Sequence, residues 1–257
     1  ERKIKTGTLN LKPYFCGMQN NHPQQSAISQ ILKDAFSYWN KTILYQLVFS
    51  MLYFSLFFMG YFYLFQYFGL WDEFIKYQDL VRTDLPAFNK KMEEIARLPQ
   101  MRNFALAFFV LLALINPLNV GLYKIYRKID MKEPVTLNDL FAGYIGFSFF
   151  KFFGFYLFWI IIFTYANALL FLGIFWIFVT LFCVPLMFFM DVKTFEGISL
   201  TFKVLRSNFS TVVPAMLVAF LFSLSGVLIC GVGFLLTFPF LNAMIYTLYQ
   251  HYYKEVV

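Results

Sequence analysis

The chain has 257 residues, of which 60% are hydrophobic, 23% aromatic and only 14% charged, and its net charge is +7. A soluble core of this size does not bury so much apolar surface, and apolar and polar residues do not alternate as in a β-barrel, so the composition predicts a polytopic α-helical membrane protein. The basic residues lie beside the apolar segments and not in one patch, which indicates topology signals and contacts to membrane lipids and argues against nucleic acid as a partner.

Residues 1 to 25 are polar and lack the apolar core of a signal peptide, so we expect a cytoplasmic tail followed by a single membrane domain over residues 26 to 257. Beyond Ser26, apolar side chains recur at helical spacing and form one stripe: Ile28, Ile31, Leu32, Ala35, Phe36 and Trp39. The stripe predicts an amphipathic helix in the membrane interface, with its apolar side in the lipid.

Residues 43 to 71 carry no charged side chain and predict the first span. Residues 72 to 102 hold equal numbers of acidic and basic residues and predict an outer loop of two short helices broken at Pro86. The loop is either a solvated cap on the bundle or a docking surface for another protein. The apolar side chains of such a surface are Phe74, Val81, Phe88, Met92 and Ile95.

The second span is predicted over residues 103 to 123 and is followed by a basic cluster. In the connector after it, Thr136 and Asp139 have the spacing of a capping box, which predicts the start of another helix.

The charge-free run from residue 152 to 190 is long enough to cross a hydrocarbon core of ~30 Å about twice, at ~1.5 Å per residue. We therefore predict spans over residues 144 to 165 and 168 to 190, with the reversal near Ala166 and Asn167.

An amphipathic segment over residues 191 to 208 precedes the last charge-free run, which predicts spans over residues 209 to 230 and 233 to 253. Gly231 and Gly233 permit the tight turn between them. Lys and Arg concentrate beside the ends of the spans that would face inwards, so the sequence predicts a bacterial inner-membrane protein with both termini in the cytoplasm.

Each third of the chain has the same order of an amphipathic helix, a span, an outer turn and a second span. The second spans each contain a proline: Pro117, Pro185 and Pro239. A proline removes one hydrogen bond from a helix and bends it, so the pattern predicts a pseudo-threefold repeat of three hairpins with kinked second helices.

The last of these repeats resembles the polytopic membrane domain associated with bacterial glycerophosphodiester phosphodiesterases and its uncharacterised six-span relatives. The residues that carry the resemblance are the segment 202 to 208 and Gly231, Gly233, Pro239, Ala243, Tyr246 and Tyr249. It covers about the last quarter of the chain and the rest only by layout. The catalytic domain of that family is absent, so the resemblance implies a fold and a role in the cell envelope without an activity.

Chemistry-bearing motifs are scarce. The cysteines and the two histidines lack metal-ligand spacing, and no predicted span contains an acidic residue, so we predict no catalytic, cofactor or metal site and no enzyme activity. Four asparagines lie in or beside the spans: Asn116, Asn119, Asn167 and Asn242. They either line a cavity or hydrogen-bond the helices to one another, which is the commoner role of such residues.

Two functional classes follow. The first is a non-enzymatic scaffold, assembly factor or accessory subunit of a larger membrane complex, with other membrane protein subunits as partners. The second is a binder or transporter of lipid or of a small hydrophobic solute. The buried polar residues are too few to specify a substrate, which favours the first class.

Overall fold

The computed structural model describes residues 24–169, 171–228 and 231–253, and all regular elements in these ranges are helices. The predicted tail falls almost wholly outside the described residues. In chain order the elements are α1 (Gln24–Lys41), α2 (Ile43–Tyr67), α3 (Leu70–Ile75), α4 (Leu80–Thr83), α5 (Leu85–Ala96), α6 (Pro99–Ile115), α7 (Leu118–Asp130), η2 (Leu137–Tyr144), α8 (Ser148–Asn167), α9 (Phe171–Val179), α10 (Cys183–Phe189), α11 (Thr194–Ser225), η3 (Gly226–Leu228), α12 (Val232–Thr237) and α13 (Phe240–Tyr252).

Six stretches of the described chain are long and apolar enough to cross a membrane: Ile43–Tyr67, Pro99–Asp130, Ser148–Asn167, Phe171–Phe189, Thr194–Leu228 and Val232–Tyr252. The predicted all-α membrane fold with six transmembrane helices is therefore confirmed. Several boundaries differ from the prediction by a few residues. The first stretch ends at Tyr67 and not at residue 71, and the second runs from Pro99 to Asp130 and not from 103 to 123. The third begins at Ser148 and not at 144, because residues 137 to 144 form the separate 3-10 helix η2.

The helices follow one order three times, as the sequence predicts. Each unit has a short first helix, an unbroken spanning helix and a returning helix that is broken in two. The units are α1–α2–α6–α7, η2–α8–α9–α10 and α11–α12–α13. In the third unit the first two helices are fused, and Asn208 marks their junction because its φ of −130° and ψ of 29° interrupt α11. This is the predicted boundary between residues 208 and 209.

A backbone feature recurs with the units. Lys132 follows α7 with φ of 57° and Asp191 follows α10 with φ of 52°, and these are the non-glycine residues with positive φ in the described chain. A left-handed residue directly after a helix ends it and lets its last carbonyls accept hydrogen bonds. At the end of α7, the Lys128 carbonyl accepts from the Glu133 N–H at 2.8 Å. The chain therefore enters the second and the third unit through the same left-handed turn.

The three units close into a ring. The broken helix of each unit packs against the spanning helix of the next, so α6 lies on α8, α9 on α11, and α12 on α2. The short first helices follow the same rule, since η2 packs on α7, α11 on α10, and α1 on α13. The third unit thus contacts the first through the same kinds of helices by which the first contacts the second, and the three units form a closed ring.

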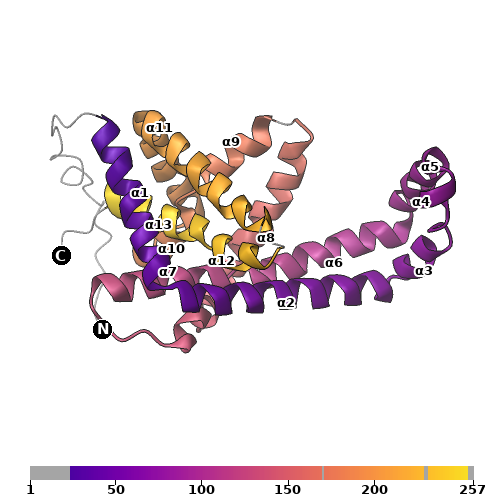
Figure 1. Ribbon diagram of the computed structural model, residues 1–257, viewed down its shortest axis with the longest axis horizontal. Coiled ribbons are helices and arrows are strands. Elements are labelled where there is room, and N and C mark those ends of the chain that lie inside the picture. Colours follow the sequence, from indigo (N-terminus) through magenta and orange to yellow (C-terminus); the bar gives the residue numbers. More distant parts are fainter. Residues whose placement is uncertain (1–23, 170, 229–230, 254–257) are drawn as a thin grey trace, which may run out of the picture.

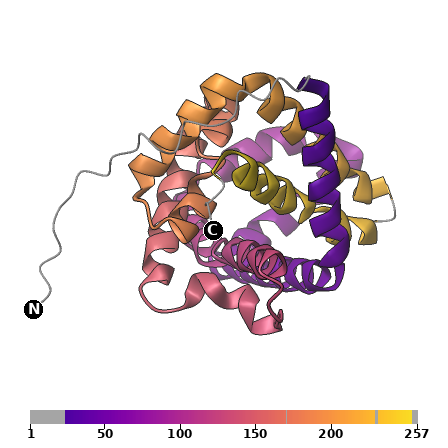
Figure 2. The same cartoon turned by 90° about the vertical axis from the view of Figure 1, so that its left-hand side faces the viewer.

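The C-terminal helix α13 occupies the middle of this ring (Figure 2). Its buried residues include Phe240, Ala243, Met244, Tyr246, Leu248 and Tyr249, whereas α2 buries only Gln46, Phe49 and Ser50 of its 25 residues. The unbroken helix α2 therefore presents most of its apolar side chains outwards, whereas α13 forms a large part of the core.

The first hairpin is longer than the others and carries the outer loop away from the ring (Figure 1). At its far end α3, α4 and α5 form a cap, with a small core of Leu70, Ile95 and Phe104. The predicted two helices broken at Pro86 are wrong. Pro86 lies in the first turn of α5, where its missing N–H costs nothing, and the side chain of Asp84 caps the helix by accepting from the Ala87 N–H at 3.0 Å.

The amphipathic helix α1 is also placed differently from the prediction. Its stripe faces protein and not lipid, because Ile31 and Ala35 are fully buried. The Phe36 ring lies 4.6 Å from that of Phe240 on α13 and 5.0 Å from that of Phe222 on α11. An apolar stripe next to a membrane helix can be buried by lipid or by protein, and here α11 and α13 cover it.

Candidate functional site

The returning helices are each interrupted beside a proline. Pro117 separates α6 from α7 and Pro239 separates α12 from α13, so both prolines stand at the start of the second segment. Pro185 lies in the first turn of α10, after a break over residues 180 to 182. The three predicted kinks are therefore full breaks, and a break at membrane depth requires partners for the freed backbone groups.

Aromatic donors from the following unit satisfy two of these breaks. The Tyr144 hydroxyl donates to the carbonyl of Leu114 at 2.7 Å and to that of Ile115 at 3.1 Å. The Trp39 indole N–H donates to the carbonyl of Leu236 at 2.8 Å. Leu114 and Leu236 are each three residues before their proline, so the same carbonyl is satisfied in both units.

The break beside Pro185, in the second unit, contains local hydrogen bonds instead. The Thr180 hydroxyl donates to the carbonyl of Trp176 at 2.7 Å and accepts from the indole N–H of Trp159 at 2.8 Å. The Trp176 carbonyl also accepts from the Thr180 N–H at 3.1 Å, so the buried Thr180 hydroxyl adds a second hydrogen bond at the end of α9.

Three of the four predicted asparagines meet at the interface between α7 and α13. The Asn242 amide donates to the Asn119 oxygen at 3.1 Å, and the Asn119 amide donates to the Asn116 backbone oxygen at 2.9 Å. At the two ends, the Tyr123 hydroxyl donates to Asn242 at 3.1 Å and the Tyr53 hydroxyl donates to Asn116 at 3.3 Å. The side-chain amides of Asn116, Asn119 and Asn242 therefore each have a partner within the protein.

Asn167 does not join this network. It ends α8 at the second hairpin turn, where its amide donates to the Phe163 carbonyl at 3.0 Å. It therefore caps its own helix.

A cluster of three tyrosines lies beyond these asparagines, towards the end of α7. The three asparagines, these tyrosines, Tyr53, Tyr123 and Asp130 together form a polar column along α7. The rings of Tyr38, Tyr126 and Tyr246 lie 5.2 to 5.8 Å apart. The Asp130 carboxylate accepts from the Tyr38 hydroxyl at 2.5 Å and from the Tyr246 hydroxyl at 2.6 Å, which joins α1, α7 and α13. Burial and the hydrogen bond to Asp130 raise the pKa of Tyr38, so its hydroxyl remains a donor at neutral pH.

The predicted capping box at the start of η2 is present and carries two ion pairs as well. Asp139 accepts from the Thr136 N–H at 2.9 Å and pairs with Lys124 at 2.9 Å and Lys128 at 2.8 Å. Burial raises the pKa of the Asp139 carboxyl, but the hydrogen bonds from Lys128, Lys124 and Thr136 outweigh it and hold that pKa well below its ordinary value. The result is a charged clamp between η2 and α7.

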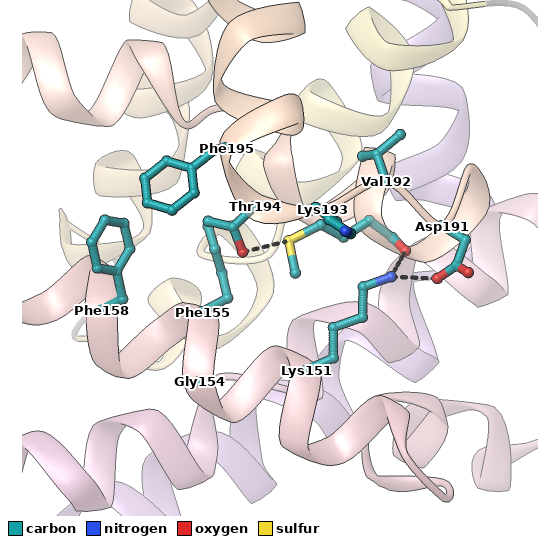
Figure 3. Close-up of a pocket in the computed structure, with 10 residues that line it drawn as sticks. Lys151, Gly154, Phe155, Phe158, Asp191, Val192, Lys193, Thr194 and Phe195 are labelled. Atoms are coloured by element: carbon teal, nitrogen blue, oxygen red, sulfur yellow. Dashed lines mark hydrogen bonds and ion pairs between the residues drawn. The ribbon is translucent and has the colours of Figure 1, made fainter. Parts of the chain in front are cut away.

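Two cavities lie on the outside of the ring. One, of about 640 Å³, is almost wholly apolar and runs between α2, α6, η2 and α8, with Gly60, Leu114, Phe141 and Tyr144 in its wall. The other, of about 560 Å³, lies between α8, the end of α10 and the start of α11, and Figure 3 shows Lys151, Asp191 and Lys193 at it beside aromatic rings.

The five residues predicted as a docking surface differ in their exposure in the structure. Ile95 and Met92 belong to the small core of the cap, and the rings of Phe74 and Phe88 contact each other edge to face at 6.2 Å. Only Val81 is exposed, at 47%. The exposed apolar residues of the cap are instead Trp71, Ile75, Val81 and Leu85.

Several residues of the site are missing from the sequence-based prediction: Tyr38, Tyr53, Tyr123, Asp130 and Tyr246 in the polar column, and Trp39 and Tyr144 at the breaks. One signal was available, because positions 116, 119, 123, 126 and 130 are spaced three and four apart and all carry Asn, Tyr or Asp. This spacing puts them on one face of a helix.

Comparison with known proteins adds no relative, since no family model, no curated protein and no solved structure matches the chain.

Proposed function

We propose that the protein is a non-enzymatic scaffold or accessory subunit of a larger membrane complex, in the bacterial inner membrane with both termini in the cytoplasm. The observation that carries this proposal is the cap. The longest hairpin holds α3, α4 and α5 clear of the ring (Figure 1), and this cap exposes the apolar side chains of Trp71, Ile75, Val81 and Leu85. Exposed apolar side chains on an otherwise charged cap fit the apolar centre of an interface with another membrane protein.

The polar column supports the same role. Its asparagines bond to one another and to tyrosines of the chain, so they provide no set of open donors and acceptors for a substrate. Hydrogen bonds between membrane helices commonly hold a bundle together, and here they lie where α7 meets α13.

Site-specific photo-crosslinking tests the proposal. A photoreactive residue in place of Val81, in intact membranes, is expected to crosslink to one particular membrane protein. Changing Trp71 and Ile75 to Asp is expected to abolish that crosslink and the corresponding larger species in native gels. The control, Gln78→Asp with Asn89→Asp, adds the same charge at exposed polar positions of the cap and is expected to keep both. Crosslinks only to lipid, or an unchanged partner in the Asp variant, would contradict the proposal.

Binding of lipid or a hydrophobic solute is the second candidate, and the apolar cavity of about 640 Å³ beside α2 and α6 favours it. Gly60→Leu puts a Cβ 2.6 Å from the Leu111 side chain and so crowds the wall of this cavity, and a loss of bound lipid in mass spectra with an unchanged cap crosslink would support it. Transport through the ring has less support, because buried side chains of α7 and α13 pack its centre.

A further inference from the structure

The smaller cavity combines charge and apolar surface. Lys151 from α8 and Asp191 and Lys193 from the connector before α11 lie at it, and its other walls are mostly apolar and include three phenylalanine rings (Figure 3). The Lys151 ammonium donates to the Asp191 carboxylate at 2.6 Å and to the Met187 carbonyl at 2.7 Å. An ammonium has three donors, so one donor of Lys151 is left for a ligand.

The charge at the cavity favours an anion. Lys151 and Lys193 outnumber Asp191 by one, and Lys193 is exposed. The Asp191 side chain is 96% exposed, so water screens its ion pair with Lys151, and such pairs contribute little stability. An incoming phosphate can therefore bind Lys151 beside Asp191 or replace it.

The apolar walls favour a lipid over a small soluble anion. Phe155, Phe158 and Phe195 line the cavity, and Phe195 is 74% exposed on the outer side of α11. Gly154 widens the cavity, since no atom lies within 4 Å of the position that a Cβ there would take. Basic side chains next to an outward-facing apolar groove match the two parts of a phospholipid.

We propose that this cavity binds one anionic phospholipid, with the phosphate at Lys151 and Lys193 and an acyl chain along Phe155, Phe158 and Phe195. The site is separate from the cap, so it holds whether or not the cap binds a protein partner. It places a lipid at the junction of the second and third units, where α8, α10 and α11 meet.

Native mass spectrometry of the full chain in detergent, with added phosphatidylglycerol, phosphatidylcholine or free glycerol phosphate, tests the site. Phosphatidylglycerol is expected to bind, and the other two are expected to bind at least tenfold more weakly. Lys151→Gln with Lys193→Gln is expected to weaken phosphatidylglycerol binding roughly 30-fold, from about fivefold for each lysine near an anionic headgroup. The matched control, Lys33→Gln with Lys41→Gln, removes the same charge from exposed positions on α1 and is expected to change binding less than twofold.

Two further variants separate the site from general effects of charge and folding. Gly154→Phe enters open space and is expected to remove binding while the protein stays folded. Asp191→Asn removes the competing carboxylate and is expected to tighten binding. Equal binding of phosphatidylglycerol and phosphatidylcholine, binding of free glycerol phosphate as tight as that of the lipid, or full binding by Gly154→Phe would each overturn the proposal.

Discussion

Replacing Asn242 with Leu decides whether the asparagines hold the helices together or form a binding site. The Asn242 side chain makes two bonds to α7, with Asn119 and with Tyr123, both at 3.1 Å. Leu has nearly the same size, so the change removes the bonds and leaves little void. A hydrogen bond between membrane helices is worth about 0.6 kcal/mol on average and about 1.7 kcal/mol at most, so the free energy of unfolding is expected to fall by about 1–3 kcal/mol.

The assay is reversible unfolding in mixed micelles of dodecyl maltoside and dodecyl sulfate, followed by tryptophan fluorescence. Asn167→Leu is the matched control, because the hydrogen bond that the Asn167 amide donates among the described residues stays within its own helix, and it is expected to change stability by less than about 0.5 kcal/mol. In a double-mutant cycle, Asn242→Leu and Tyr123→Phe are expected to be coupled, since both remove the same bond.

The contrary result is equally clear. If Asn242→Leu matches Asn167→Leu in stability while the protein loses a bound lipid or solute, the asparagines form a ligand site and the interpretation as helix contacts is wrong.

Three other predictions follow from the clamp and the helix breaks. Asp139→Asn loses the ion pairs with Lys124 and Lys128 and is expected to lower the free energy of unfolding at pH 7 by about 2–3 kcal/mol. The folded-state pKa of Asp139 lies below its ordinary value, so its contribution to the free energy of unfolding is complete above the unfolded-state pKa of about 3.9 and is lost as the pH falls through the folded-state pKa. The melting temperature of the wild type should therefore fall more steeply below pH 4 than that of Asp139→Asn. Gly121→Ala puts a Cβ 2.1 Å from the Leu140 carbonyl oxygen, and an unfolding titration is expected to show a free energy of unfolding lower by about 1–3 kcal/mol. The matched Gly154→Ala enters open space within α8 and is expected to raise the free energy of unfolding by up to about 1 kcal/mol. Trp39→Phe leaves the Leu236 carbonyl without its donor, and a thermal melt should show a loss of about 1–3 kcal/mol that a substitution of the exposed Trp71 does not cause.

Much of the architecture could be predicted because it depends on length and charge. The charge-free runs are too long for single crossings, and this fixed the second and third hairpins. The reversals near Asn167 and Gly231 are where the structure has them, and Gly231 has a φ of 76° that suits its turn. The helix cap could be recognised from the sequence as well, since the spacing of Thr136 and Asp139 predicted the start of η2.

One missed feature depends on whether lipid or another helix covers an apolar surface. The stripe of α1 has the same composition whether lipid or α13 covers it, so periodicity alone cannot choose. The break at Pro86 was misread for a different reason. The pattern of Asp84 followed two residues later by Pro86 is typical of a capped helix start, and there proline belongs to the helix.

The breaks show how the three units remain alike although their residues differ. A proline frees backbone carbonyls at membrane depth, and these need donors that lipid does not supply. In the first and third units the donor is an aromatic side chain on the short helix of the following unit, Tyr144 in one case and Trp39 in the other, and both reach the carbonyl three residues before the proline. Tyrosine and tryptophan share no hydrogen-bonding group, so a comparison of residues does not detect the equivalence. The common element is a hydrogen-bond donor that reaches the carbonyl three residues before the proline. Trp39 and Leu236 are 197 residues apart in the chain, so the bond that satisfies the break beside Pro239 also joins the first unit to the third and closes the ring.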